Sequence, residues 1–367
     1  MPDAGTLSTR PTGIEATPRP TRQWEFDALR VAAIAGVVAI HVIGMMVSNP
    51  EIRGTLRWWV AVAAHAGSTW VVPVFVMLSG ALVLAPRAHA AGPGAFYRKR
   101  FVRILPAFVV WHVVYLLLIR SLLLDQDLSL RYTLQMLLDA RVYTGLYFLW
   151  LIAGLYLIAP VLAAFLHAGG QRRALATAAV ALGWGVVVWI VPSVSTLLGT
   201  RRINDLGAWD QWVPYVGYFV AGWALHRVVL RGRALWAVAV VVAVLLAELI
   251  WQAGHPGHKV LDGLFPVHRL GAVTAVAAIG VFLLAVAIGA RWSPPAAVQR
   301  VLRRLSDASF GVFLVHLVLF ALLRALSPAV READSLSVML GAYALVLGSA
   351  FLVSIGAARV PYLRTLF

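Results

Sequence analysis

Stretches of about 20 mostly apolar residues recur along the whole sequence, and they limit the possible fold more than any other feature. A helix of about 20 residues crosses the hydrocarbon core of a membrane, which is roughly 30 Å thick. The composition agrees with this interpretation, because 61% of the 367 residues are hydrophobic and only 13% are charged. We therefore predict an all-α fold, a polytopic bundle of transmembrane helices.

The apolar stretches predict about ten spans, with boundaries reliable to a few residues. They lie near residues 28–48, 58–84, 104–123, 145–166, 174–193, 212–230, 234–253, 266–290, 308–326 and 337–358. The second is long enough to tilt or break, and Pro73 inside it favours a kink. Residues 1–23 are rich in Pro, Thr and Gly and predict a disordered cytoplasmic tail. The remainder, residues 24–367, is expected to form one membrane domain.

The basic residues predict how the bundle is oriented. With the N-terminus in the cytoplasm, most of the 31 Lys and Arg fall in inner segments, so we expect both termini to be cytoplasmic. The same bias accounts for the net charge of +16 without a nucleic-acid partner. The chain has no cysteine, which excludes thiolate metal sites and cysteine nucleophiles. The HPGH segment, residues 255–258, lacks the further ligands that a metal site needs, so no metal is expected.

The segment DALRVAAIAGVVAIH, residues 27–41, places three ionisable side chains on one apolar helix. At 100° per residue, His41 lies about 20° past three full rotations from Arg30 and about 16 Å further along the helix axis. Asp27 lies on nearly the same side, which makes an Asp27–Arg30 pair feasible. His41 then sits near the bilayer midplane, where an ionisable residue usually faces the bundle interior. Two interpretations stay open, a general base or a neutral histidine bonded to another helix.

Three motifs in the first third of the chain resemble the acyltransferase-3 family of membrane acyltransferases. The first is Arg30, ten residues and His41, with Asp27 and Leu29 before them. The second and third are VPVFVMLSGALVL at 72–84 and FYRKRFVRILPAFVVW at 96–111. Weaker similarity continues through YFLWLIAGLYLIAPVL at 147–162, where Tyr147 replaces a common His, and SFGVFLVHLVLF at 309–320.

The resemblance implies an O-acyltransferase that moves an acyl group, commonly acetyl, from acetyl-CoA to a hydroxyl group. The expected acceptor is a carbohydrate, a glycolipid or a cell-envelope glycan, and the expected location is the bacterial cytoplasmic membrane. Because no cysteine is available, direct transfer is simpler than an acyl-enzyme, although an acyl-histidine stays open. Acceptor identity, acyl chain length, the membrane face of the product and the oligomeric state are left open by the sequence.

The motif positions also imply roles for individual residues. His41 would act as general base, Arg30 would orient the donor, and Asp27 would hold Arg30. The basic cluster on the third motif would bind the CoA phosphates, although a basic inner loop explains the same charges. This cluster comprises Arg98, Lys99, Arg100 and Arg103. Candidate cavity-lining residues are Trp150, His316 and Ser79.

Two alternatives to catalysis remain at this point. In a transporter or flippase, His41, His65 and Glu248 would relay protons. A regulatory or structural protein would keep the fold and lack the chemistry. Outside the motifs, Arg269 and Glu248 are candidates for an ion pair between adjacent helices.

Overall fold

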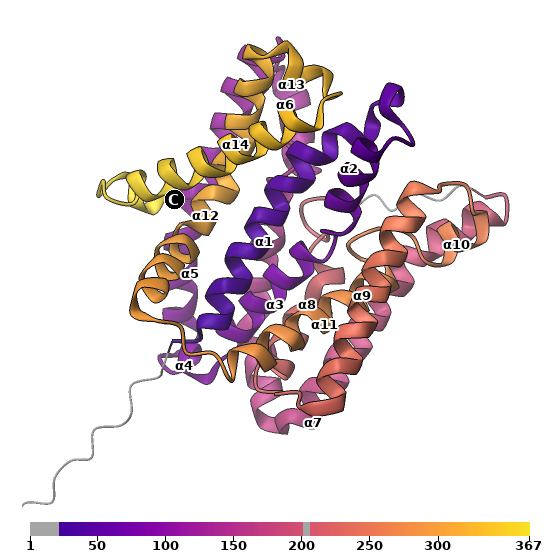
Figure 1. Cartoon of the computed structure of the whole chain (residues 1–367). Helices are drawn as coiled ribbons and strands as arrows, with labels where there is room; N and C mark the ends of the chain where they lie inside the picture. The colour runs from indigo at the N-terminus through magenta and orange to yellow at the C-terminus, as the bar shows by residue number, and fades with distance from the viewer. Residues whose placement is uncertain (1–21, 201–205) are drawn as a thin grey trace, which may run out of the picture.

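The computed structural model describes residues 22–200 and 206–367, and all regular structure in these residues is helical (Figure 1). The all-α membrane bundle predicted from the apolar stretches is confirmed. The long apolar elements are α1 (Trp24–Val42) with η1 (Ile43–Ser48), α2 (Leu56–Ala66), α3 (Val71–Val83), α5 (Gly92–Val114) with the π-helix η3 (Tyr115–Leu123), α7 (Tyr147–Leu197), α9 (Gly232–Gly254), α11 (Ala272–Gly289), α12 (Ala296–Leu326) and α14 (Leu336–Ala357). The shorter elements are η2 (Pro50–Ile52), α4 (Pro86–His89), α6 (Leu130–Leu138), η4 (Val213–Tyr215), α8 (Val216–Leu225), α10 (Lys259–Leu264), α13 (Pro328–Glu332) and η5 (Leu363–Thr365).

The ten predicted spans correspond to these elements once α7 is divided. Among the described residues, eight helical segments are long and apolar enough to cross a membrane, and the longest of them is α7, with 51 residues. Gly170 breaks α7 with φ 65° and ψ −161°, a conformation that glycine adopts without steric cost. The first arm of α7 (147–169) and the second arm (171–197) are therefore two spans. The short apolar helix α8 occupies the predicted span 212–230.

The predicted break of the second span occurs in the turn at residues 67–70, between α2 and α3. Pro73 lies in the first turn of α3, where a missing N–H group costs no intrahelical hydrogen bond. The chain therefore bends a few residues before Pro73. Residues 1–21 of the predicted tail lie outside the described residues.

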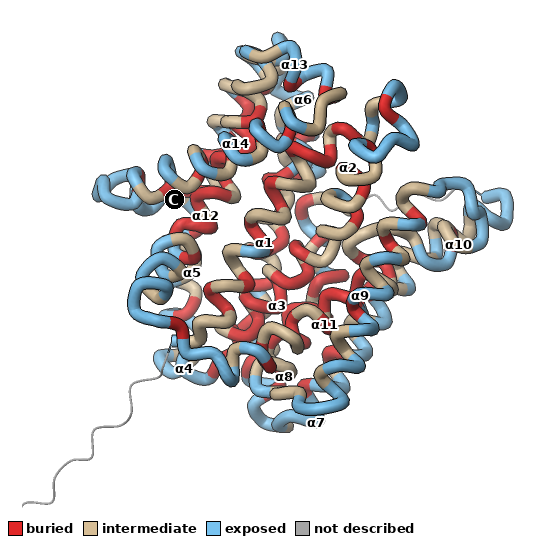
Figure 2. Tube along the Cα trace, viewed as in Figure 1, coloured by how far each residue is buried: buried red, intermediate tan, exposed pale blue. Residues whose placement is uncertain are grey.

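Buried residues concentrate around α1, α3, α8 and α11, while the outer helices expose one face (Figure 2). On α9 the exposed face is apolar: Trp236 is 73% exposed, and Val240 and Val244 are each 60% exposed. These residues are four positions apart and so share one side of the helix. Such an apolar outer stripe is suited to contact with lipid rather than water.

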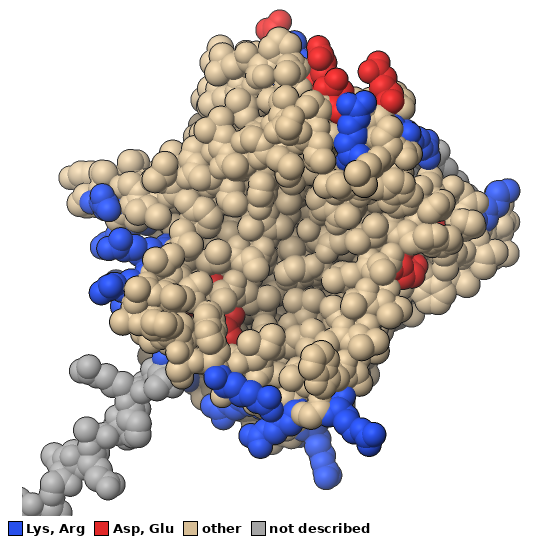
Figure 3. Space-filling model, in the orientation of Figure 1, with Lys and Arg blue, Asp and Glu red and all other residues tan. Residues whose placement is uncertain are grey.

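Charged side chains are distributed unevenly over the molecule. In Figure 3, Lys and Arg gather along the side that carries the C-terminal segment, α4 and the turn of α7. Most of the acidic side chains visible in that view lie at the opposite end, near α13 and α2. We call the first of these the basic side. The asymmetry is the one that the positive-inside rule describes.

The contact between α3 and α8 depends on glycine. A Cβ atom at Gly80 would collide with the carbonyl oxygen of Phe219, and one at Gly222 would collide with that of Met77. The two backbones therefore approach so closely that no larger residue fits at either position. Since Ser79 precedes Gly80 on α3, this contact also fixes the direction in which Ser79 points.

We expect Gly80→Ala to lower the free energy of unfolding by about 1–3 kcal/mol, because the added methyl group must push α3 and α8 apart. Thermal unfolding of the purified protein in detergent measures the effect. Gly341→Ala on α14 is the matched control, because a Cβ there meets no atom within 4 Å. Equal melting temperatures for the two variants would contradict the packing argument.

Candidate active site

A cavity of about 380 Å³ lies between α1, α3, α5, the first arm of α7 and α12. The lining residues of each helix lie mainly toward one side of it, so each helix contributes one face. The lining includes Arg30, Val37 and His41 from α1; Val72, Phe75 and Ser79 from α3; Arg100, Arg103 and Ile104 from α5; Tyr147, Phe148, Ile152 and Tyr156 from α7; and Ser306, Ser309, Phe310 and Phe313 from α12. Its volume is within the usual range of small-molecule sites, about 300–1,000 Å³.

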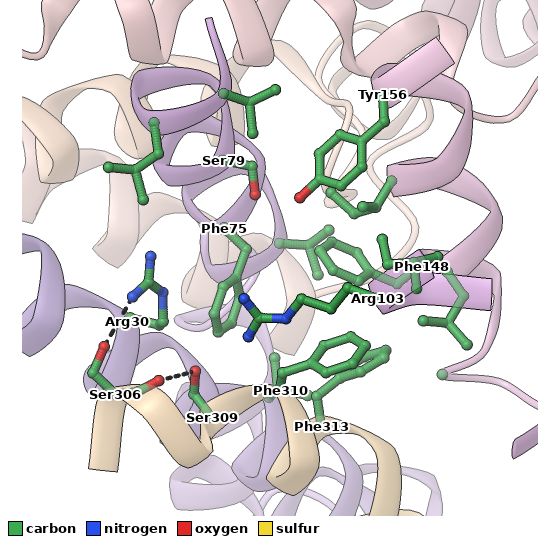
Figure 4. Close-up of a pocket in the computed structure, with 18 of the residues that line it drawn as sticks. Arg30, Phe75, Ser79, Arg103, Phe148, Tyr156, Ser306, Ser309, Phe310 and Phe313 are labelled. Atoms are coloured by element: carbon green, nitrogen blue, oxygen red, sulfur yellow. Dashed lines mark hydrogen bonds between the residues drawn. The ribbon is translucent and has the colours of Figure 1, made fainter. Parts of the chain in front are cut away.

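Five of the residues singled out from the sequence line this cavity, although they come from three helices: Arg30, His41, Ser79, Arg100 and Arg103. Figure 4 shows the guanidinium groups of Arg30 and Arg103 on either side of Phe75. In the same view, the hydroxyl of Tyr156 points toward Ser79. The fold thus brings the first and third motifs to one enclosed space.

Asp27, in the first turn of α1, contacts side chains from three segments of the chain. Its side chain is 6% exposed and accepts hydrogen bonds from Arg22 Nη2 at 3.0 Å and from Ser306 Oγ at 2.6 Å. Arg30 Nη1 lies 3.7 Å from Asp27 Oδ1, so the predicted pair is present. Arg30 Nη1 also donates to Ser306 Oγ at 2.9 Å (Figure 4). Ser306 was missed because nothing in the sequence indicates that the start of α12 packs against α1.

His41 lies beside a second histidine at the inner face of α12. The ring centroids of His41 and His316 are 5.6 Å apart. His316 is fully buried, and its Nδ1 lies 3.0 Å from the carbonyl oxygen of Val312. Because a carbonyl only accepts, Nδ1 carries the hydrogen and Nε2 is left as an acceptor. That Nε2 is buried without a hydrogen-bond partner among the described residues.

The four basic residues of the third motif divide into two pairs. Arg98 and Lys99 are exposed and do not line the cavity. Arg100 lies between two aromatic rings, with its guanidinium carbon 5.7 Å from the Phe96 centroid and 5.5 Å from the Tyr156 centroid. Arg100 and Arg103 are therefore the two that reach the cavity.

Trp150 does not line the cavity. Its indole nitrogen donates to His112 Nε2 at 3.1 Å, and its ring meets Trp209, which is 71% exposed, with centroids 5.9 Å apart. Trp150 is thus on the opposite side of the first arm from the cavity-lining Phe148.

In residues 22–200 and 206–367, no group of three or more His, Asp or Glu could hold a metal ion.

The suggested Arg269–Glu248 ion pair is absent from the described part of the chain. Arg269 Nε instead donates to the hydroxyl of Tyr215 at 2.6 Å. Glu248 Oε2 is buried with no hydrogen-bond partner among the described residues. The loop at residues 265–271 places Arg269 against Tyr147 of α7 and Tyr215 of η4 instead.

The bundle and its cavity define a class of protein, an integral membrane protein with a polar site enclosed by its helices. The family model described as an acyltransferase domain matches residues 23–359, nearly the whole chain. The chain therefore belongs to the acyltransferase-3 family, as its motifs predicted, and membership supports a membrane acyltransferase in general. No match was found among the curated proteins or the solved structures.

We expect Asp27→Asn to reduce the free energy of unfolding by about 1–3 kcal/mol, because two guanidinium groups lose a buried anionic partner. Asp307→Asn is the matched control: Asp307 also pairs with Arg22, but its side chain is 62% exposed, so the loss should stay below about 1 kcal/mol. Chemical denaturation in detergent compares the two. A larger loss for Asp307→Asn would contradict the central role of Asp27.

Proposed function

We propose that this protein transfers an acetyl group from acetyl-CoA to a hydroxyl of a carbohydrate, glycolipid or cell-envelope glycan, with His41 as general base. The observation that carries the proposal is one cavity that joins two arginines on the basic side, Arg100 and Arg103, to His41. We further propose that the basic side faces the bacterial cytoplasm, where acetyl-CoA is made. Family membership supports the acyltransferase class over a transporter.

The cavity has a basic part and an aromatic part, which match the charged and the less polar parts of an acyl-CoA. Its basic end offers guanidinium forks, which suit phosphate groups. Its middle is aromatic, with Phe75, Phe148 and Phe313, and suits the less polar arm that carries the thioester. Because His41 lies about 16 Å beyond Arg30 along α1, phosphates at the arginines would leave the thioester close to His41.

Direct transfer needs a base and little else from the protein. The acceptor hydroxyl oxygen bonds to the thioester carbonyl carbon, and the carbon–sulfur bond breaks. His41 takes the proton of the hydroxyl and returns it to the departing sulfur, so that the histidine ends as it began. With no cysteine in the chain, a thioester intermediate on the protein is excluded.

His316 would hold His41 in the required tautomer. A histidine base is oriented by an acceptor at its second nitrogen, the place that a carboxylate takes in the hydrolase triads. The acceptor atom Nε2 of His316 is buried, unpartnered among the described residues and on a ring adjacent to His41. We assign His316 a positioning role on this ground.

We expect His41→Gln to reduce transfer at least about 100-fold while the dissociation constant for acetyl-CoA stays within about twofold, since a base acts on the acceptor. Incorporation of labelled acetyl groups into membranes from expressing cells measures transfer, and calorimetry on purified protein measures binding. His258→Gln, in an exposed loop, is the control. Wild-type transfer by His41→Gln would eliminate the base, and substrate flux without acetyl-CoA consumption would indicate a transporter.

Arg103→Gln and Arg100→Gln are each expected to weaken acetyl-CoA binding at least about tenfold, because a phosphate loses a charge-assisted contact. Arg98→Gln and Lys99→Gln are matched controls, since they remove the same charge from the same helix outside the cavity. Equal weakening by all four substitutions would mean that the cluster acts only through its general charge.

A further inference from the structure

Arg269 is a permanent cation inside the bundle, and it has no acidic partner in the part of the chain that the structure describes. The salt bridges between described residues involve Arg22 and Arg30 with Asp27 and Asp307, and none involves Arg269. An arginine stays charged under all physiological conditions. A charged side chain at membrane depth is costly and is usually paired or functional.

Three tyrosines hold Arg269 in one position. Its Nε donates to the hydroxyl of Tyr215, and its guanidinium carbon lies 4.4 Å from the ring centroid of Tyr147. Its backbone carbonyl accepts from the hydroxyl of Tyr218 at 3.1 Å. These contacts fix the side chain and its backbone while adding no negative charge.

The segment that carries Arg269 is also fixed on both sides. His268 stacks on Trp189 from the second arm of α7, with centroids 3.9 Å apart and ring planes at 11°. Gly271 turns so tightly that a Cβ there would collide with the carbonyl oxygen of Pro266. The loop is therefore built to hold the guanidinium at this depth.

The two terminal nitrogens of Arg269 have no acceptor among the described residues. They are also not sealed within the protein, in contrast to Arg324 Nε, which is fully buried without a partner. Four N–H donors therefore remain for an external group. A planar guanidinium with free donors binds a carboxylate or a phosphate in a two-pronged arrangement.

Tyr147 connects Arg269 to the candidate active site. Its ring carries the guanidinium of Arg269 and also lines the cavity that contains His41. The first arm of α7 begins at Tyr147 and ends at the turn of α7, and that turn lies on the basic side (Figures 1 and 3). Tyr147 thus lines the cavity away from Arg100 and Arg103, and Arg269 lies against the ring of Tyr147.

We propose that Arg269 binds an anionic group of the acceptor, a carboxylate or a phosphate, while the acceptor hydroxyl lies at His41. This inference rests on the proposed function and adds to it the chemical class of the acceptor. The donor phosphates would lie at Arg100 and Arg103, so Arg269 is free for the second substrate. The acceptor is therefore an acidic or phosphorylated glycan or glycolipid.

Thermal shift of the full chain in detergent tests the proposal, with CoA present at saturation to occupy the donor site. The probes are glucuronate and glucose 6-phosphate, with neutral glucose as control. We expect at least one anionic probe to stabilise the wild-type protein saturably and glucose to have no effect. The two probes distinguish a carboxylate from a phosphate. Equal effects of the three sugars, or none from any, would overturn the proposal without any variant.

Variants then assign the effect to Arg269. Arg269→Gln should weaken the anionic probe at least about tenfold, and Arg269→Lys should retain part of the affinity because it keeps the charge. Undiminished probe affinity in Arg269→Gln would overturn the assignment. CoA affinity is measured in parallel: retained CoA binding with no anion binding rejects only the anion site, whereas no CoA binding in the wild type rejects the proposed function.

Discussion

The carboxylate of Asp27 is the interaction on which the candidate site depends. It is buried at the inner end of α1 and contacts groups from the N-terminal segment, from α1 itself and from α12. A buried carboxylate needs such partners, because an unpaired charge costs several kcal/mol in a medium of low dielectric constant. By satisfying Asp27, Ser306 fixes the register of α12 against α1. That register places His316 beside His41. The two histidines lie about 21 Å from Asp27 along α1 and about 15 Å from Ser306 along α12.

The two arginines inside the bundle, Arg30 and Arg269, have different kinds of partner. Arg30 is neutralised by Asp27 and bonded to Ser306, which suits a residue that shapes the cavity wall. Arg269 is surrounded by tyrosines, which accept hydrogen bonds and stack on a cation but carry no charge. Arg30 lines the cavity, and Arg269 lies against Tyr147, which also lines it, so the two arginines differ in their partners. A paired arginine stabilises the fold, whereas an unpaired one retains its attraction for an anion.

Hydropathy and local spacing predicted the parts of the fold that depend on neighbouring residues. The spans follow from apolar length, and the shared stripe of Arg30 and His41 follows from the helical repeat, because both lie on α1. The same repeat argues against Trp150 as a lining residue: it is two positions from Phe148 and from Ile152, hence about 200° away around the helix. Trp150 was predicted to line the cavity because it lies in the motif at 147–162, although the helical repeat places it on another side of the helix.

The contacts that could not be predicted join helices that are far apart in sequence. Ser306 and Asp27 are 279 residues apart, and no local pattern indicates that they meet. The pairing of Arg269 with Glu248 failed for a related reason. It assumed that a charged residue at the start of a span would face the preceding helix, whereas the loop at 265–271 folds inward and its path is determined by stacking on Trp189 and by the hydroxyl of Tyr218.

The positions of the charges along the cavity bear on how two substrates would meet. Arg100 and Arg103 line the cavity together with His41 and Tyr147, and Arg269 lies against the ring of Tyr147. Direct transfer would require donor and acceptor to be bound together, because no acyl group is then stored on the protein between two separate binding events. Two polyanions would repel each other in a short cavity of low dielectric constant. Under the proposed function, separate cationic groups would hold the anionic parts of the two substrates apart while their reactive, uncharged ends met at His41, so the bundle could accept a charged acceptor without losing the donor.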